Sequence, residues 1–158
     1  MIRLMPVGPG ERDALWNVLQ KYLYDMSRYY GDVIGPDGNY PYRHFDAYFA
    51  SDPGRQAFFF YDGPTLIGFS MVNAHPFLER RAGHCLAEFS VFPACRGRGL
   101  GTAAAETLFH ALPGDWQLKY TPRNETGARF WKRVTAPYGP RVTPLSSGES
   151  VLSFTVSE

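Results

Sequence analysis

Cysteine, long apolar runs and charge of one sign are all scarce in this sequence of 158 residues. The two cysteines, Cys85 and Cys95, are too few for a disulfide framework and lack the spacing of a metal clip. We therefore expect reduced thiols in a cytoplasmic protein. The four histidines are scattered along the chain, so we expect no bound metal.

Two further scarcities narrow the choice of partners. The first ten residues contain neither a long apolar run nor a cleavage-site pattern, so we expect no signal peptide and no membrane anchor. The formal net charge is only +1, which gives no reason to expect a nucleic-acid partner.

The order of the predicted elements indicates a mixed α/β fold in a single domain, residues 1–158. A chain of this length can bury one good core, and no repeat or low-complexity segment divides it. Apolar periodicity and turn residues predict strands at 2–7, within 56–72 (two strands joined at 62–64), at 84–91, 116–120, 141–145 and 150–156. The same signals predict helices at 11–30, 43–50, 102–111 and 124–133.

The most informative stretch is "CRGRGLGTAAAETLF", residues 95–109, in which three glycines alternate with other residues directly before a helical pattern. Bare backbone amides and the positive end of a helix dipole together hold phosphate, and a missing Cβ lets the anion approach the chain. Arg96 and Arg98 are placed to help neutralise it. The run therefore predicts a phosphate-binding loop.

A dinucleotide site is the first alternative, because residues 99–104 also fit the pattern G-x-G-x-x-A. Its context argues against it. The run begins about sixty per cent along the chain, too late for a doubly wound sheet to follow, and the strand at 116–120 ends without an acidic residue for the ribose. A Walker loop is excluded, because no Gly-Lys-Ser/Thr follows.

The spacing Arg96-x-x-Gly99-x-Gly101, after a strand that ends Val91-Phe92-Pro93, resembles the acyl-CoA-binding motif Q/R-x-x-G-x-G/A of the GNAT superfamily of N-acyltransferases. "TLIGFSMV" at 65–72 resembles the central strand of that family, and "TPRNETGARFWKRV" at 121–134 resembles its Asn-containing helix with an aromatic pair. The likeness covers nearly the whole chain and is weakest over 31–56. It implies the GNAT fold: a mixed, mostly antiparallel sheet splayed at its centre, with helices on both faces.

The resemblance also implies acetyl-CoA as cosubstrate. The backbone of Phe89 and Val91 would bind the pantetheine arm in a gap beside strand 116–120, and the Val91 N–H would stabilise the oxyanion of the thioester. The diphosphate would lie on the loop amides, and Asn124 would contact CoA or cap its own helix. Residues assigned to the cosubstrate are Phe89, Val91, Arg96, Gly97, Arg98, Gly99, Gly101, Thr102, Asn124 and Trp131.

Two catalytic roles are less settled by the pattern. Glu88 lies among apolar strand residues, where a carboxylate is costly unless it is paired or functional, so it is either the base or substrate anchor, or part of a structural ion pair. The family's usual acid is a tyrosine at the position of Trp131, and an indole does not supply a proton as a phenol does. Either Tyr120 or Tyr138 replaces it, or CoA leaves as a thiolate, with Trp131 packing against CoA or the core.

The acceptor side is rich in aromatic and acidic residues. Seven tyrosines between positions 22 and 48 accompany Asp25, Asp32, Asp37 and Asp46, which suits a cationic amine, although tyrosine at helical spacing is also typical of half-buried core and aspartate of turns. We expect an enzyme of bacterial type that transfers acetyl from acetyl-CoA directly to a primary amine in a ternary complex. The alternative is a catalytically silent acyl-CoA-binding module, and relatives suggest a homodimer.

Overall fold

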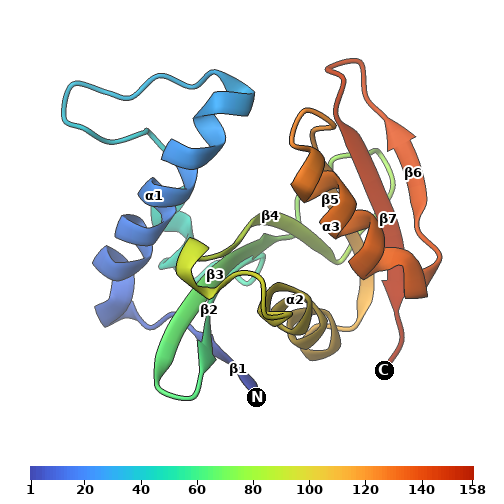
Figure 1. Cartoon of the computed structure of the whole chain (residues 1–158), viewed down its shortest axis with the longest axis horizontal. Coiled ribbons are helices and arrows are strands. Elements are labelled where there is room, and N and C mark those ends of the chain that lie inside the picture. The colour runs from blue at the N-terminus through green and yellow to red at the C-terminus, as the bar shows by residue number, and fades with distance from the viewer.

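One seven-stranded mixed sheet spans the whole chain in the computed structural model, which describes residues 1–158 (Figure 1). The strands lie in the order β1-β2-β3-β4-β5-β7-β6, and only the β4–β5 pair is parallel. The strands are β1 (Ile2–Pro6), β2 (Arg55–Asp62), β3 (Thr65–Asn73), β4 (His84–Val91), β5 (Gly114–Tyr120), β6 (Arg141–Pro144) and β7 (Ser150–Val156). The helices are α1 (Arg12–Tyr30), α2 (Leu100–Ala111) and α3 (Glu125–Thr135).

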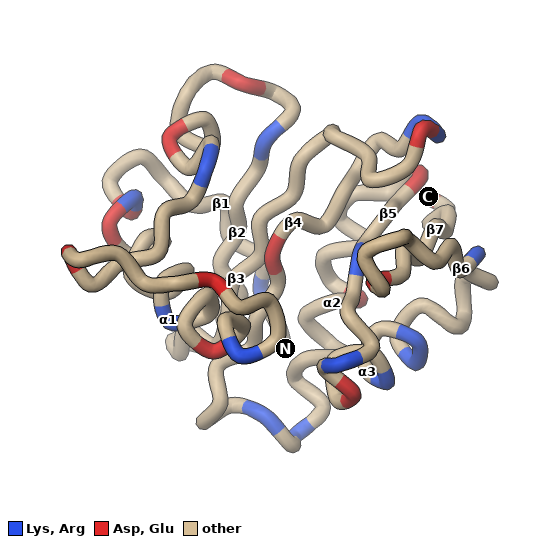
Figure 2. The backbone as a smooth tube through the Cα atoms, turned by 90° about the horizontal axis from the view of Figure 1, so that it is seen from above, with Lys and Arg blue, Asp and Glu red and all other residues tan.

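Helices cover both faces of the sheet and create two cores. On one face α1 packs its buried Leu15 and Leu19 against Phe59, Phe69 and Met71 of β2 and β3. On the other face α2 and α3 pack against the second set of strand side chains, including Leu86, Leu118 and Trp116. Figures 1 and 2 place α1 on one side of β4, and α3 with β5 to β7 on the other.

Most elements predicted from the sequence form within one or two residues of their predicted bounds. The exception is the helix predicted at 43–50, where only a single turn of 3-10 helix forms, at Phe45–Tyr48. His44 precedes it with a positive φ of 66°, which breaks the helical path, and so short a segment does not sustain an α-helix. None of the helices is both long and apolar enough to cross a membrane.

The centre of the sheet is open because β4 and β5 stay paired over only three residues. Their register ends at Leu86 opposite Leu118, and nothing in the sheet pairs with that side of β4 from Ala87 onwards. On its other side β4 pairs with β3, with a register shift between Met71 opposite Glu88 and Val72 opposite Leu86. This bulge bends the strand and increases its twist, so β4 diverges from β5. The splay that the resemblance implied is present.

Candidate active site

Backbone groups of β4 are exposed along the opening between β4 and β5. The Phe92 N–H donates to Ile67 O of β3 at 2.8 Å, and successive peptide groups of a strand point to opposite sides. Phe89 and Val91 therefore turn their N–H groups away from β3 and toward the opening. The structure places both residues where sequence analysis expected them.

The glycine loop between β4 and α2 leaves a row of amides free. Gly97 and Gly99 have φ values of 83° and 73°, and Gly99 caps α2 without a side-chain hydrogen bond. The first amide bonded in this helix is that of Ala103, which donates to Gly99 O at 3.1 Å, so the amides of residues 100–102, including Thr102, have no partner within the helix. A Cβ at Gly97 or Gly99 would meet no atom within 4 Å. Free amides, open space and a helix N-terminus together suit an anion.

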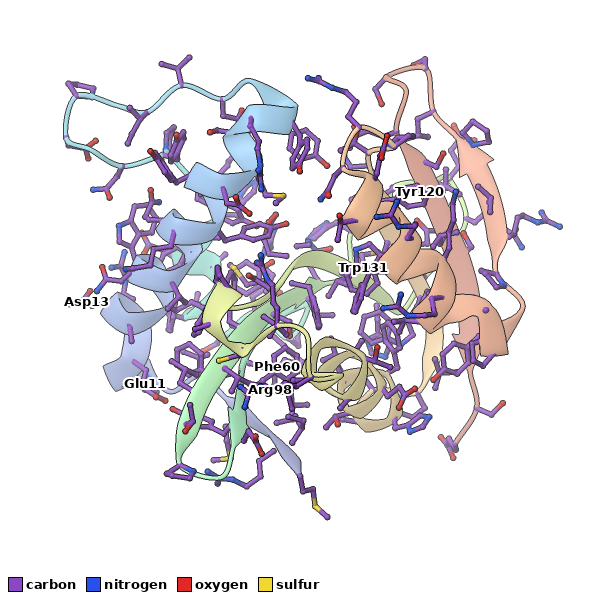
Figure 3. The ribbon with its side chains drawn as sticks, in the orientation of Figure 1. Glu11, Asp13, Phe60, Arg98, Tyr120 and Trp131 are labelled. Carbon is purple, nitrogen blue, oxygen red and sulfur yellow. The ribbon has the colours of Figure 1, made fainter.

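The two arginines of the loop differ in what they hold. The Arg96 Nε donates to Val91 O at 2.8 Å, which ties the loop to the last residue of β4. Arg98 is exposed, forms no ion pair and directly precedes Gly99, the N-cap residue of α2 (Figure 3). Arg96 therefore shapes the site as well as carrying charge, a role that its spacing alone does not reveal.

Gly101 lets neighbouring elements pack closely and also leaves its own backbone amide exposed. A Cβ there would lie 3.1 Å from a ring carbon of Phe130 on α3 and 3.9 Å from Val91 Cγ2. The missing side chain thus lets α2 approach α3 and β4, while the Gly101 amide remains in the free first turn. The space beside Gly97 and Gly99 is open, whereas the space beside Gly101 is occupied by the Phe130 ring.

On the far side of the opening, α3 is positioned by its cap. Asn124 accepts a hydrogen bond from the Gly127 N–H at 3.0 Å, which is the capping role that sequence analysis allowed. From this helix Trp131 packs edge-on against Phe89 of β4, with ring centroids 5.0 Å apart, and against Phe130 at 4.8 Å (Figure 3). Trp131 therefore contacts a strand that borders the opening.

Glu88 lies on the face of β4 that α1 covers, since its antiparallel partner Met71 belongs to that core. Its Oε2 is buried and has no hydrogen-bond partner. Burial raises the pKa of Glu88 from 4.5 to about 8, Lys119 acts to lower it and Asp32 to raise it. No structural ion pair of Glu88 within 4 Å forms, so the hypothesis of a salt-bridged glutamate is not supported.

Tyrosines surround this carboxyl group. Tyr22 comes from α1, and Tyr42 and Tyr48 come from the segment that follows it; all three pack against the same core as Met71. Burial raises the pKa of each phenol, that of Tyr48 to about 12, and the negative charge of Glu88 contributes in every case. These phenols therefore stay neutral at physiological pH and offer rings and O–H donors beside Glu88.

Two contacts that sequence analysis missed connect α1 to the second half of the sheet. Arg123 Nη1 donates to Tyr29 O, one of the terminal carbonyls of α1, at 2.8 Å. Burial and neighbouring Glu149, in the turn between β6 and β7, raise the pKa of Tyr30 to about 12. Glu149 Oε2 lies 3.7 Å from Lys119 Nζ. No short-range sequence signal links these residues, because the fold alone brings them together.

Gly68 is another residue whose role appears only in three dimensions. A Cβ on it would lie 2.2 Å from Ser90 O of β4, a distance that side chains do not tolerate. The bare glycine therefore lets β3 approach β4 immediately before the strand end at Val91. The glycine in the strand "TLIGFSMV" is therefore required by the close approach of β4.

Comparisons with known proteins agree with this geometry. Residues 14–134 match the model of the acetyltransferase (GNAT) family. An acetyltransferase from Thermus thermophilus superimposes with a TM-score of 0.70 at 18% identity, covering 99% of this chain and 97% of that one. The Escherichia coli ribosomal-protein-S18-alanine N-acetyltransferase gives 0.64 at 13% identity, with coverage of 100% and 96%.

The aminoglycoside acetyltransferase AAC(6')-Ib in complex with coenzyme A gives a TM-score of 0.69 at 12% identity, with coverage of 98% and 95%. At such identities these structures establish the fold, and they confirm the predicted mixed sheet splayed at its centre. No protein with a curated description matches the sequence. Because the family model spans most of its length, the chain belongs to the acetyltransferase (GNAT) family.

Proposed function

We propose that this protein transfers the acetyl group of acetyl-CoA to the primary amine of a small molecule or peptide, directly, in a ternary complex. The observation that carries the proposal is the combination of a free backbone edge on β4 with an anion-accepting loop at the end of the same strand. Both are open on the side away from β3. A ligand with an amide-containing arm and a diphosphate fits such a surface.

The residues present fit the cosubstrate. The Phe89 backbone would pair with the amides of the pantetheine arm as an added strand does, and residues 97–102 would hold the diphosphate on their amides. The Val91 carbonyl is already bonded to Arg96, so only its N–H remains for the thioester oxygen. There the N–H would stabilise the negative charge that develops on that oxygen during transfer.

Glu88 is the group best placed to take a proton from the acceptor. With a pKa of about 8 it is ionised mainly above that pH and in a minor fraction of molecules at neutral pH, and in this ionised form it can accept a proton from an ammonium and release it to solvent. The freed amine nitrogen then attacks the thioester carbon, a C–N bond forms, and the C–S bond breaks. The nitrogen then releases its second proton to solvent, and CoA leaves as a thiolate, or as a thiol where a proton is supplied to its sulfur.

In this proposal, either Tyr120 donates a proton to the leaving thiolate, or CoA leaves as the thiolate without a proton from the protein. Tyr138 is unsuitable, since its hydroxyl faces His110 Nε2 at 3.3 Å and its ring packs on Phe109 and Phe154. Tyr120 ends β5, the strand that borders the opening, and its side chain is largely buried (Figure 3). Trp131 acts by packing.

A second candidate is an acyl-CoA-binding module without turnover, which Trp131 at the usual tyrosine position favours. One experiment separates the two. Calorimetry with acetyl-CoA and CoA measures binding, and detection of free thiol measures turnover with a panel of primary amines. Release of CoA with at least one amine, at least tenfold slower in Glu88→Gln than in the wild type or Glu106→Gln, supports the enzyme. Binding without release for any amine supports the module, and absence of binding refutes both.

A further inference from the structure

A second carboxylate on the acceptor side has no hydrogen-bond partner for one of its oxygens. Ser147 Oγ donates a hydrogen bond to Glu149 Oε1 at 3.1 Å. Glu149 Oε2 is buried and accepts no hydrogen bond, and the same is true of Glu88 Oε2. The side chain of Glu149 is only 16% exposed. A buried carboxylate oxygen without a donor is costly, so two of them in one region call for an explanation.

The two carboxylates face the same space. Leu86 and Leu118, the last paired residues of β4 and β5, point into the core of α2 and α3, so Lys119 on β5 points to the opposite face. Glu88 faces that same side. Lys119 then extends to Glu149, with Nζ 3.7 Å from Oε2, so both carboxylates border one region on the α1 side of the splayed strands.

Tyr30 lies close to both carboxylates. Burial raises the pKa of its phenol to about 12, the charges of Glu149, Glu88 and Asp32 act in the same direction, and the phenol also interacts as a hydrogen-bond partner with the Glu149 side chain. Lys119 is the nearby cation. Its ammonium lies 3.7 Å from Glu149 Oε2, beyond hydrogen-bond distance, and 5.1 Å from the centroid of the Phe77 ring. Arg123 is already engaged with Tyr29 O. The region therefore keeps an excess of acceptors for cationic N–H donors.

We infer that the acceptor carries a second positive charge, held by Glu149, in addition to the reacting amine held by Glu88. This inference rests on the proposed function and narrows its substrate class to diamines and amines with a remote cationic group. The reacting ammonium donates to Glu88 Oε2 among the tyrosine rings, where a cation is stabilised. The second ammonium donates to Glu149 Oε2 and displaces Lys119 from it. Glu149 is a specificity-determining residue, and it takes no part in the chemistry.

The test compares matched amines on the full-length protein. Release of CoA is measured for 1,4-diaminobutane and butylamine, and for 1,3-diaminopropane and propylamine, in the wild type, Glu149→Gln and Glu106→Gln. The glutamine keeps the Ser147 contact, and Glu106 is an exposed control on α2. A charge-assisted hydrogen bond predicts a diamine KM at least about tenfold below that of its monoamine. Glu149→Gln should abolish that ratio and leave the monoamine KM within about twofold, whereas Glu106→Gln should change neither.

The variant Lys119→Gln distinguishes a cation site from a purely structural ion pair between Lys119 and Glu149, because only the former would change the relative KM values of the two amines. Without the resident cation, the ratio of monoamine to diamine KM should increase. Equal KM values for the two amines in the wild type, or a parallel loss for both in Glu149→Gln, would overturn the inference and leave the proposed function intact. If no amine causes release of CoA, the proposed function fails. The cation site is then tested by thermal unfolding: it exists if the diamine raises the midpoint of the wild type more than the monoamine does and this difference is lost in Glu149→Gln, and it is refuted if the two amines have the same effect.

Discussion

Replacing Glu88 by glutamine should change how the stability of the folded protein depends on pH. The native carboxyl group has a pKa of about 8, against 4.5 when unburied. Between these values the native state keeps a proton that the unfolded chain has lost, so the free energy of unfolding falls as pH rises through this window. Glutamine does not titrate, and the variant therefore escapes that loss.

The size of the effect follows from the pKa difference. A rise from 4.5 to about 8 corresponds to at most about 5 kcal/mol. Glu88 keeps part of its surface in contact with solvent, which screens its charge, so we expect about 2–3 kcal/mol. For a chain of this length that is a change of roughly 5–10 °C in the midpoint of thermal unfolding.

The assay is thermal unfolding followed by circular dichroism at pH 5 to 9. The difference in midpoint between Glu88→Gln and the wild type should grow in favour of the variant up to about pH 8 and then level off. The new amide can also shift the unfolding midpoint by an amount that does not depend on pH, and comparing the midpoints across pH removes this constant difference. The midpoints of the control Glu106→Gln should follow those of the wild type at every pH. If the two curves of Glu88→Gln and wild type stay parallel from pH 5 to 9, Glu88 is not a buried carboxyl group with a raised pKa, and its role as base loses its physical support.

Three further substitutions test other parts of the site. Gly68→Ala would place a Cβ 2.2 Å from Ser90 O and should lower the free energy of unfolding, measured by urea denaturation, by about 1–3 kcal/mol or more. The control Gly10→Ala, with open space around it, should change that free energy little. Similar values for the two variants would contradict the close approach of β3 and β4. Asn124→Ala should cost about 1 kcal/mol through loss of the cap of α3, and an affinity for CoA reduced more than about tenfold would instead indicate direct contact. Trp131→Phe should leave kcat within about threefold, because the ring packs on Phe89 and donates no proton in this proposal; a loss above about a hundredfold would show that the indole takes part in the chemistry.

The predicted elements and the glycine loop before α2 were accessible from the sequence because both depend on local signals. Alternation, glycine and proline residues and the Asn124 cap act over a few residues, and all of these predictions except the helix at 43–50 correspond to an element or cap that forms. The helix expected at 43–50 failed because its apolar pattern is also compatible with side chains that fold onto α1 without a helical backbone, as Phe45 does.

Contacts across the opening were not accessible for the opposite reason. Arg123 and Tyr29 are separated by 94 residues, and the positions of Lys119 and Glu149 depend on which face each strand presents. The bulge at β4 changes that face between Leu86 and Glu88 by an amount that no alternation pattern encodes. Gly68 and Gly101 likewise owe their roles to a neighbouring strand and to Phe130, which only the folded chain brings near.

The hydrogen bond from Arg96 to the Val91 carbonyl joins the glycine loop to the end of β4, the two places proposed to hold opposite ends of acetyl-CoA. The Val91 N–H is proposed to contact the thioester oxygen, and the Val91 carbonyl is bonded to Arg96 in the loop that is proposed to bind the diphosphate. Binding of the nucleotide portion by the loop would therefore restrict the motion of Val91 and keep its N–H directed at the reacting carbonyl. A truncated thioester that lacks the nucleotide should therefore react slowly even at saturating concentration, a deficit in kcat as well as in KM.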